Sequence, residues 1–168
     1  MKERRVGMTI RRATEIETMD IIKQAVDVMK EATMGFLEPT EEIAMGMLSP
    51  FLADGGYFLV FAEQNAVAGW IGVCQTSDPF SEEMTGFIYE IYVLPDKRGR
   101  GIAEMLCHEA FELLKADGCS KVQLNVFMGN RAQELYRKLG FVNVATLMEK
   151  KLDLGSTSTA FDNDQTCQ

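Results

Sequence analysis

The chain has 168 residues, which suits one domain better than two. Apolar residues make up 46% of it and charged residues 25%, proportions that are ordinary for a globular protein and argue against global disorder. The formal net charge of −8 argues against nucleic-acid binding through a broad basic face. A cationic partner is more compatible with this charge.

Membrane insertion and metal binding find no support in the sequence. No apolar run reaches the roughly 20 residues that a membrane span needs, and no apolar signal segment follows the basic N-terminus. We therefore expect a cytoplasmic protein with no membrane partner. The four cysteines form no CxxC pair, and the lone histidine, His108, lies in the middle of a predicted helix. We accordingly expect no metal site and no disulfide framework.

The first half of the chain is expected to form a strand, two helices and a hairpin. Residues 1–7 resemble an N-terminal extension, and a strand begins near Thr9. Apolar residues spaced by three and four predict a helix over residues 15–32. Thr40, followed by two acids, predicts the start of a second helix. Aromatic and branched residues around a Gln-Asn turn predict a hairpin of residues 57–63 and 67–75.

The second half alternates strands with helices. A very apolar strand over residues 85–95 ends at a proline, which cannot donate to a ladder. An apolar stripe predicts a helix over residues 100–116 that stops at Gly118. A strand (121–127), a helix (130–139) and a last strand (141–152) follow, and residues 153–168 are expected to be a flexible tail. The predicted domain spans residues 8–152 in the order β-α-α-β-β-β-α-β-α-β.

A glycine-rich turn joins the most apolar strand to the next helix and reads Arg98-Gly99-Arg100-Gly101-Ile102-Ala103. The first N–H groups of a helix lack internal partners and carry partial positive charge, and glycines let a phosphate approach them closely. The turn therefore predicts a pyrophosphate site, although a turn that only caps the helix is the alternative. The P-loop pattern GxxxxGK[ST] is absent, and Glu104 stands where a dinucleotide fingerprint needs its third glycine.

The same turn resembles the acetyl-coenzyme A signature of the GNAT superfamily, [QR]-x-x-G-x-[GA], with Arg98, Gly101 and Ala103 in the fixed places. Residues 130–141 resemble the family's second segment, N-x-x-A-x-x-L-Y-x-x-x-G-F, with the alanine one place earlier. The resemblance covers about residues 8–152. It implies an α/β (α+β) fold of GNAT type, with a mixed, mostly antiparallel sheet of about six or seven strands and about four helices.

The resemblance also implies a binding mode for acetyl-CoA, with no metal and no covalent enzyme intermediate. In the family, the strand before the turn bulges and separates from its neighbour, and the pantetheine arm pairs with the exposed backbone. That role would fall to Ile91, Tyr92 and Val93, with the Val93 N–H facing the thioester carbonyl. The pyrophosphate would lie beside the turn residues Arg98, Gly99, Arg100, Gly101, Ile102 and Ala103.

Two residues are candidates for the proton transfers. An alkyl ammonium, with a pKa of about 10.4, must lose a proton before it attacks, and the leaving thiolate benefits from an acid. Glu90 is the candidate base, because a charge in an apolar strand is costly unless it faces water or a site. Strand alternation predicts that it shares a face with Ile88 and Tyr92. The alternative is a solvent-facing glutamate.

Tyr136 falls on the family's tyrosine position and is the candidate acid, and the alternative is a tyrosine packed against the sheet. Asn130 resembles the family asparagine that touches the pantetheine arm, and it could equally be a helix N-cap. Both roles follow from the resemblance.

The sequence thus favours an enzyme that transfers acetyl from acetyl-CoA to a primary amine, on a small molecule or a peptide, by direct attack. Acids near residues 38–42 and 78–83 would suit a cationic acceptor, or are ordinary solvated charges. Two other hypotheses remain open: a non-catalytic acyl-CoA-binding module, which would need neither Glu90 nor Tyr136, and a transferase with a longer acyl donor. Family members often dimerise, so a homodimer is also implied.

Overall fold

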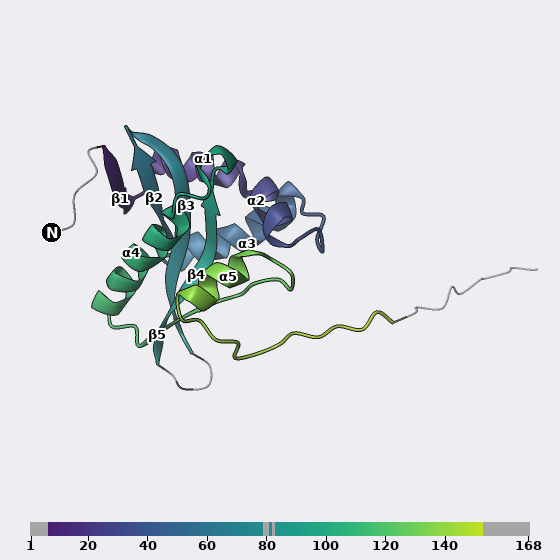
Figure 1. Cartoon of the computed structure of the whole chain (residues 1–168). Coiled ribbons are helices and arrows are strands. Elements are labelled where there is room, and N and C mark those ends of the chain that lie inside the picture. Colours follow the sequence, from purple (N-terminus) through teal and green to yellow (C-terminus); the bar gives the residue numbers. More distant parts are fainter. Residues whose placement is uncertain (1–6, 79–80, 82, 153–168) are drawn as a thin grey trace, which may run out of the picture.

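The structure is a computed structural model that describes residues 7–78, 81 and 83–152. These residues form one sheet in the order β1-β2-β3-β4-β5 (Figure 1). The strands are β1 (Met8–Arg12), β2 (Tyr57–Glu63), β3 (Ala66–Ser77), β4 (Met84–Val93) and β5 (Lys121–Leu124). The helices are α1 (Glu15–Lys23), α2 (Ala25–Ala32), α3 (Glu41–Ala53), α4 (Ile102–Ala116) and α5 (Ala132–Lys138), with a short 3-10 helix, η1 (Pro95–Lys97). The predicted C-terminal tail, and the predicted N-terminal extension apart from Gly7, lie outside the described residues.

The sheet is mixed and mostly antiparallel, as predicted. Strands β1 to β4 pair antiparallel with their neighbours, and only β5 runs parallel to β4. Gln64 and Asn65 turn the chain between β2 and β3 with φ of +49° and +67°. Two successive residues with positive φ give the tight turn whose twist matches a hairpin, which confirms the predicted pair of strands.

Several elements differ from the prediction. The helix expected over residues 15–32 is two helices, because the chain tightens at Gln24, whose N–H bonds to the carbonyl of Ile21. The described residues form five strands and five α-helices, where we expected about six or seven strands and four helices. Residues 141–152 form no strand. The alternating apolar residues there match the pattern of a strand with one buried face. A strand also needs a neighbouring strand that bonds its backbone N–H and C=O groups, and the apolar pattern does not supply one.

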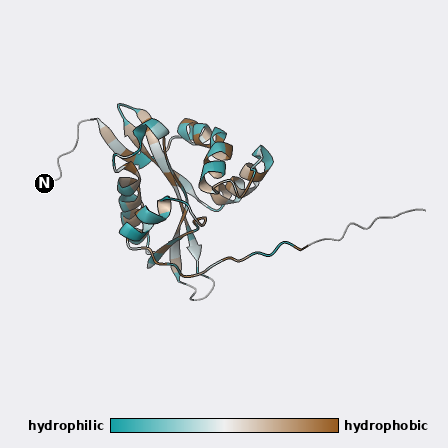
Figure 2. Cartoon of the chain, turned by 45° about the vertical axis from the view of Figure 1, so that its right-hand side comes forward, coloured by the Kyte–Doolittle hydropathy of each residue, from teal (hydrophilic) through white to brown (hydrophobic). Residues whose placement is uncertain are grey.

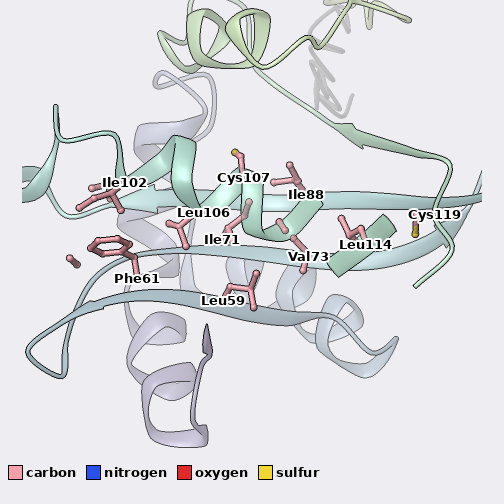
Figure 3. Close-up of a cluster of buried hydrophobic side chains, with 13 residues drawn as sticks. Leu59, Phe61, Ile71, Val73, Ile88, Ile102, Leu106, Cys107, Leu114 and Cys119 are labelled. Carbon is pink, nitrogen blue, oxygen red and sulfur yellow. The ribbon is translucent and has the colours of Figure 1, made fainter. Parts of the chain in front are cut away.

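Two apolar clusters cover the two faces of the sheet. One packs α4 against it through a stripe of side chains one helical turn apart (Figure 3), namely Ile102, Leu106, Ala110 and Leu114. The other packs α1, α2 and α3 against the opposite face, around Phe51, Phe58 and Trp70. Figure 2 shows hydrophobic and hydrophilic sides on the same helices, which is typical of amphipathic helices that cover a sheet. The site described below lies along β4, which has one of these clusters on each of its faces.

Replacing Leu106 by Ala is expected to lower the free energy of unfolding by about 2–5 kcal/mol, because it removes buried methyl groups and leaves a cavity. The Leu106 side chain is 0% exposed in the α4 layer. Unfolding in urea measures the change. The control is Leu147→Ala, at a side chain that is 97% exposed. It should change stability by less than about 0.5 kcal/mol, and equal losses in both variants would contradict the described core.

Candidate functional site

Strand β4 carries an irregularity in the middle of its length. Gly72 of β3 pairs with Glu90, while the next residue, Val73, pairs with Ile88. Tyr89 is therefore an extra residue on β4, which makes a β-bulge. The bulge predicted from the family resemblance is thus present, two residues before Ile91.

The bulge coincides with the point where β4 and β5 separate. Within the described chain, β5 pairs only with residues 85–88 of β4. The N–H of Leu94 points toward β3 and donates to the Ala68 carbonyl at 3.0 Å. Because successive N–H groups alternate sides along a strand, those of Val93 and Ile91 point to the side that β5 has left, whereas that of Tyr92 points to β3. This edge offers backbone groups to an extended ligand.

The glycine-rich turn follows directly after β4 and η1. Gly99 and Gly101 have φ of +74° and +77°, a left-handed conformation that favours glycine. A Cβ at either position would meet no atom within 4 Å, so the space beside the turn is open. Gly101 is the N-cap of α4, and no described side chain caps that end. The N–H groups of Ile102 and Ala103 are therefore free to face an anion.

Both arginines of the turn are already engaged by acids. The Arg98 Nε donates to the Val93 carbonyl at 2.9 Å, and its guanidinium pairs with Glu31 of α2 at 2.9 Å. Arg100 donates two bonds to the Glu63 carboxylate at the end of β2. These acids offset part of the positive charge that the sequence predicted here. The backbone N–H groups at the start of α4 are consequently the donors that remain without a side-chain cap.

The Glu90 carboxylate lies on the face of the sheet that α1, α2 and α3 cover. The Trp70 Nε1–H donates to it at 2.7 Å. Burial raises the pKa of Glu90, and the bond from Trp70 offsets part of that rise. Glu90 is thus half-buried and bonded to Trp70 rather than fully solvent-facing, and a raised pKa is a property that a general base would need.

The predicted grouping of strand residues is only partly right. Tyr92 shares the Glu90 face, and its ring lies 4.9 Å from that of Trp70. Ile88 instead packs in the α4 layer on the opposite face. The prediction for Ile88 is wrong because the bulge at Tyr89 shifts the alternation by one residue.

Tyr136 approaches from the α4 side of the sheet. Its side chain is 8% exposed, and its ring lies 5.7 Å from that of Phe141. Burial, with a smaller effect of Cys107 on α4, raises the pKa of Tyr136 to about 12. The phenol thus keeps its proton at neutral pH. None of the described hydrogen bonds joins it to Glu90, and the two side chains lie on opposite faces of the sheet.

Asn130 links the beginning of α5 to the end of α2. Its Oδ1 accepts from the Ala132 N–H at 2.8 Å, and its Nδ2 donates to the Ala32 carbonyl at 2.9 Å. The N-cap of α5 is Arg131, so Asn130 lies one residue before the N-cap and still bonds the first N–H of the helix. Contact with a pantetheine arm stays a prediction.

Other chemistries find little support in the described residues. No group of three or more His, Cys, Asp or Glu side chains there could hold a metal ion. Burial raises the pKa of Cys107 to about 12, which makes its thiol a poor nucleophile. None of the described helices combines the length and the apolar content needed to cross a bilayer.

Sequence reasoning missed three partners of the site. Trp70 was expected to be core, and it is buried, but it also bonds Glu90. Glu31 holds Arg98 from 67 residues away. Glu63 holds Arg100 from 37 residues away. No local pattern signals such long-range pairs.

Comparison with known proteins agrees with this geometry. Residues 23–141, well over half of the chain, match the model of the acetyltransferase (GNAT) family. The chain belongs to the GNAT family. Among GNAT relatives it is 35% identical over 91 residues to N-alpha-acetyltransferase MAK3 of Arabidopsis thaliana, which covers 54% of this chain and 46% of that protein. It is 29% identical over 87 residues to the uncharacterized N-acetyltransferase YycN of Bacillus subtilis. This match covers 51% of this chain and 54% of that protein. The chain spans about half the length of the curated relatives it matches.

Solved structures confirm the GNAT fold. A Pyrococcus furiosus protein assigned to the acetyl transferases has a TM-score of 0.76 and 27% identity, over 86% of this chain and 99% of that chain. An aminoglycoside acetyltransferase from a soil metagenomic sample, in complex with sisomicin, has a TM-score of 0.61 and 18% identity, over 89% and 97%. At that identity the second likeness shows the fold alone.

Proposed function

We propose that this protein transfers an acetyl group from acetyl-CoA to a primary amine. The observation that carries the proposal is that the part of β4 without a β5 partner leads directly into the uncapped glycine turn. A pantetheine arm is an extended chain of amides that leads to a pyrophosphate. Ile91 and Val93 supply backbone groups for the amides, and residues 99–103 supply N–H groups for the pyrophosphate. GNAT membership and the N-acetyltransferase relatives support the same activity.

The proposed reaction needs only groups that the site holds. The amine gives a proton to Glu90, directly or through water, and its nitrogen attacks the thioester carbonyl carbon. The Val93 N–H stabilises the negative charge that develops on the carbonyl oxygen. The carbon–sulfur bond then breaks, and Tyr136 gives its proton to the sulfur. The second proton of the attacking nitrogen, passed directly or through water, restores the Tyr136 phenol. The products are an acetamide and free coenzyme A, and the proton on Glu90 leaves to solvent.

Thiol release from acetyl-CoA across amines, polyamines and peptide N-termini tests the proposal. We expect thiol release that equals the amount of acetylated amine, with a higher kcat/KM for acetyl-CoA than for longer acyl-CoA donors. Tight acetyl-CoA binding without acetylation of any amine would instead indicate the non-catalytic module. A faster reaction with a longer acyl-CoA would correct the donor. Failure to bind acetyl-CoA would overturn the proposal.

A further inference from the structure

Exposed apolar side chains gather beside the proposed site. Ten large apolar side chains among the described residues before residue 141 are exposed, and seven of them come from three neighbouring segments. These segments are the loop between α2 and α3, the first two turns of α3 and the loop after β5. We name the seven the apolar rim: Met34, Phe36, Leu37, Ile43, Met47, Phe127 and Met128.

Two of these segments touch although they are about 90 residues apart in sequence. The rings of Phe36 and Phe127 stack with centroids 6.0 Å apart. The bond from Asn130 to the Ala32 carbonyl joins the same two loops. The loop between α2 and α3 and the loop after β5 thus form one surface, next to the strand that has separated from β4.

The third segment leads from the rim to the proposed base. Ile43, Met47 and Phe51 follow one another at intervals of four residues, so they lie along one side of α3. The Phe51 ring stacks on that of Tyr89 with centroids 4.4 Å apart. Tyr89 is the bulge residue next to Glu90. An apolar path therefore runs from the base outwards to the exposed rim.

Such a surface indicates the chemistry of the acceptor. Exposed apolar patches on soluble proteins mark binding sites, and burying an apolar side chain against one is favourable. The exposed acids Glu41 and Glu42 stand beside the rim and attract an ammonium group, whereas Glu38 is already paired with Lys30 at 3.5 Å. A polycation would gain little from the rim itself. One amine next to an apolar group matches both features.

We infer that the acceptor is a primary amine carried on an apolar group, as at a peptide N-terminus whose first side chain is large and apolar. The inference rests on the proposed function and names the acceptor class for the same site. It narrows the cationic acceptor that the net charge and the acidic segments suggested to an amine that also carries an apolar group. An α-amine, with a pKa of about 7.7–8.0, is also partly neutral at physiological pH, which lightens the task of Glu90.

A set of peptides that differ only in the first residue tests the inference. We expect kcat/KM to be about 10- to 100-fold higher for Met, Leu or Phe than for Ser, Asp or Lys, as expected for one buried apolar side chain. Rates with two amines that are not peptides, phenethylamine and spermidine, show whether an apolar group is enough. A higher kcat/KM for phenethylamine means that the acceptor does not have to be a peptide. Peptides linked covalently to coenzyme A give a second readout by affinity alone: the Met conjugate should bind more tightly than the Asp conjugate.

A rim variant tests the surface itself. Phe36→Ser should lower kcat/KM for the Met peptide about tenfold, mainly through KM, and should leave the Ser peptide nearly unchanged. Met84→Ser, at an exposed apolar side chain where β4 begins, is the matched control and should change neither.

Three results would overturn the inference. A preference for spermidine or the Lys peptide would do so while leaving the proposed function intact. A dimer that Phe36→Ser dissociates, with acceptor preference unchanged, would assign the rim to a second copy of the chain. No acetylation of any amine, with equal affinity for all conjugates, would remove the proposed function as well.

Discussion

Replacing Glu90 by Gln should lower kcat/KM for the amine by about 100-fold or more, the usual contribution of a general base. Gln keeps the shape of the side chain and an oxygen that can accept from Trp70, so the change removes the base alone. Thiol release under saturating acetyl-CoA measures the effect. Glu112→Gln, at an exposed acid on α4, is the control and should leave the rate unchanged.

The pH dependence of the wild type and of Glu90→Gln separates the ionisation of Glu90 from that of the amine substrate. Burial raises the pKa of Glu90, so the wild-type rate should climb with pH through a range above that of an ordinary carboxyl group. Ionisation of the amine acts equally on both enzymes. The ratio of their rates therefore isolates Glu90, and this ratio should fall at low pH, where Glu90 is protonated. A ratio that does not change with pH would contradict the assignment.

Stability provides a further test of Glu90. Its pKa is higher in the folded state than in the unfolded state, so the folded state binds more protons. Its contribution to stability is complete below the ordinary carboxyl pKa and is lost as pH rises through the raised one. Glu90→Gln should therefore match or exceed the wild-type stability at neutral pH. Activity and stability that fall together would indicate a structural glutamate.

The parts of the site that the sequence predicts well are local. The turn at Gln64 and Asn65 and the glycine turn before α4 depend on residues adjacent in the chain, and the backbone φ values agree with both. The helix α4 follows from one apolar stripe, which packs as expected. Such features need no knowledge of distant partners.

The parts that the sequence does not predict depend on distant residues. The bulge at Tyr89 was expected only from the family resemblance, because it is a mismatch of register between two strands and the apolar pattern of β4 continues through it unchanged. The acids that hold Arg98 and Arg100 come from α2 and β2, so the charge of the turn could not be predicted from its own residues. For residues 141–152, the pattern of a strand was present without a neighbour to pair with.

Tyr136→Phe should lower kcat about 100-fold, because the phenol no longer protonates the leaving sulfur. The ring that packs against Phe141 remains, so stability should change little. With a pKa of about 12, the wild-type phenol should add no descending limb to the pH profile at neutral or mildly alkaline pH. Thiol release measures kcat, and Tyr57→Phe, in β2 on the far side of β3, is the control.

The leaving group of the donor distinguishes an acid from a packing residue. An acetyl thioester of a more acidic thiol needs less help from a proton, so the loss in Tyr136→Phe should shrink with such a donor. A packing defect would slow both donors equally. Unchanged kcat with acetyl-CoA would leave the ring as a structural element of the α4 layer. A donor-dependent loss instead requires the phenol proton to reach the sulfur, and so places the thioester between Tyr136 and the base on the other face of the sheet.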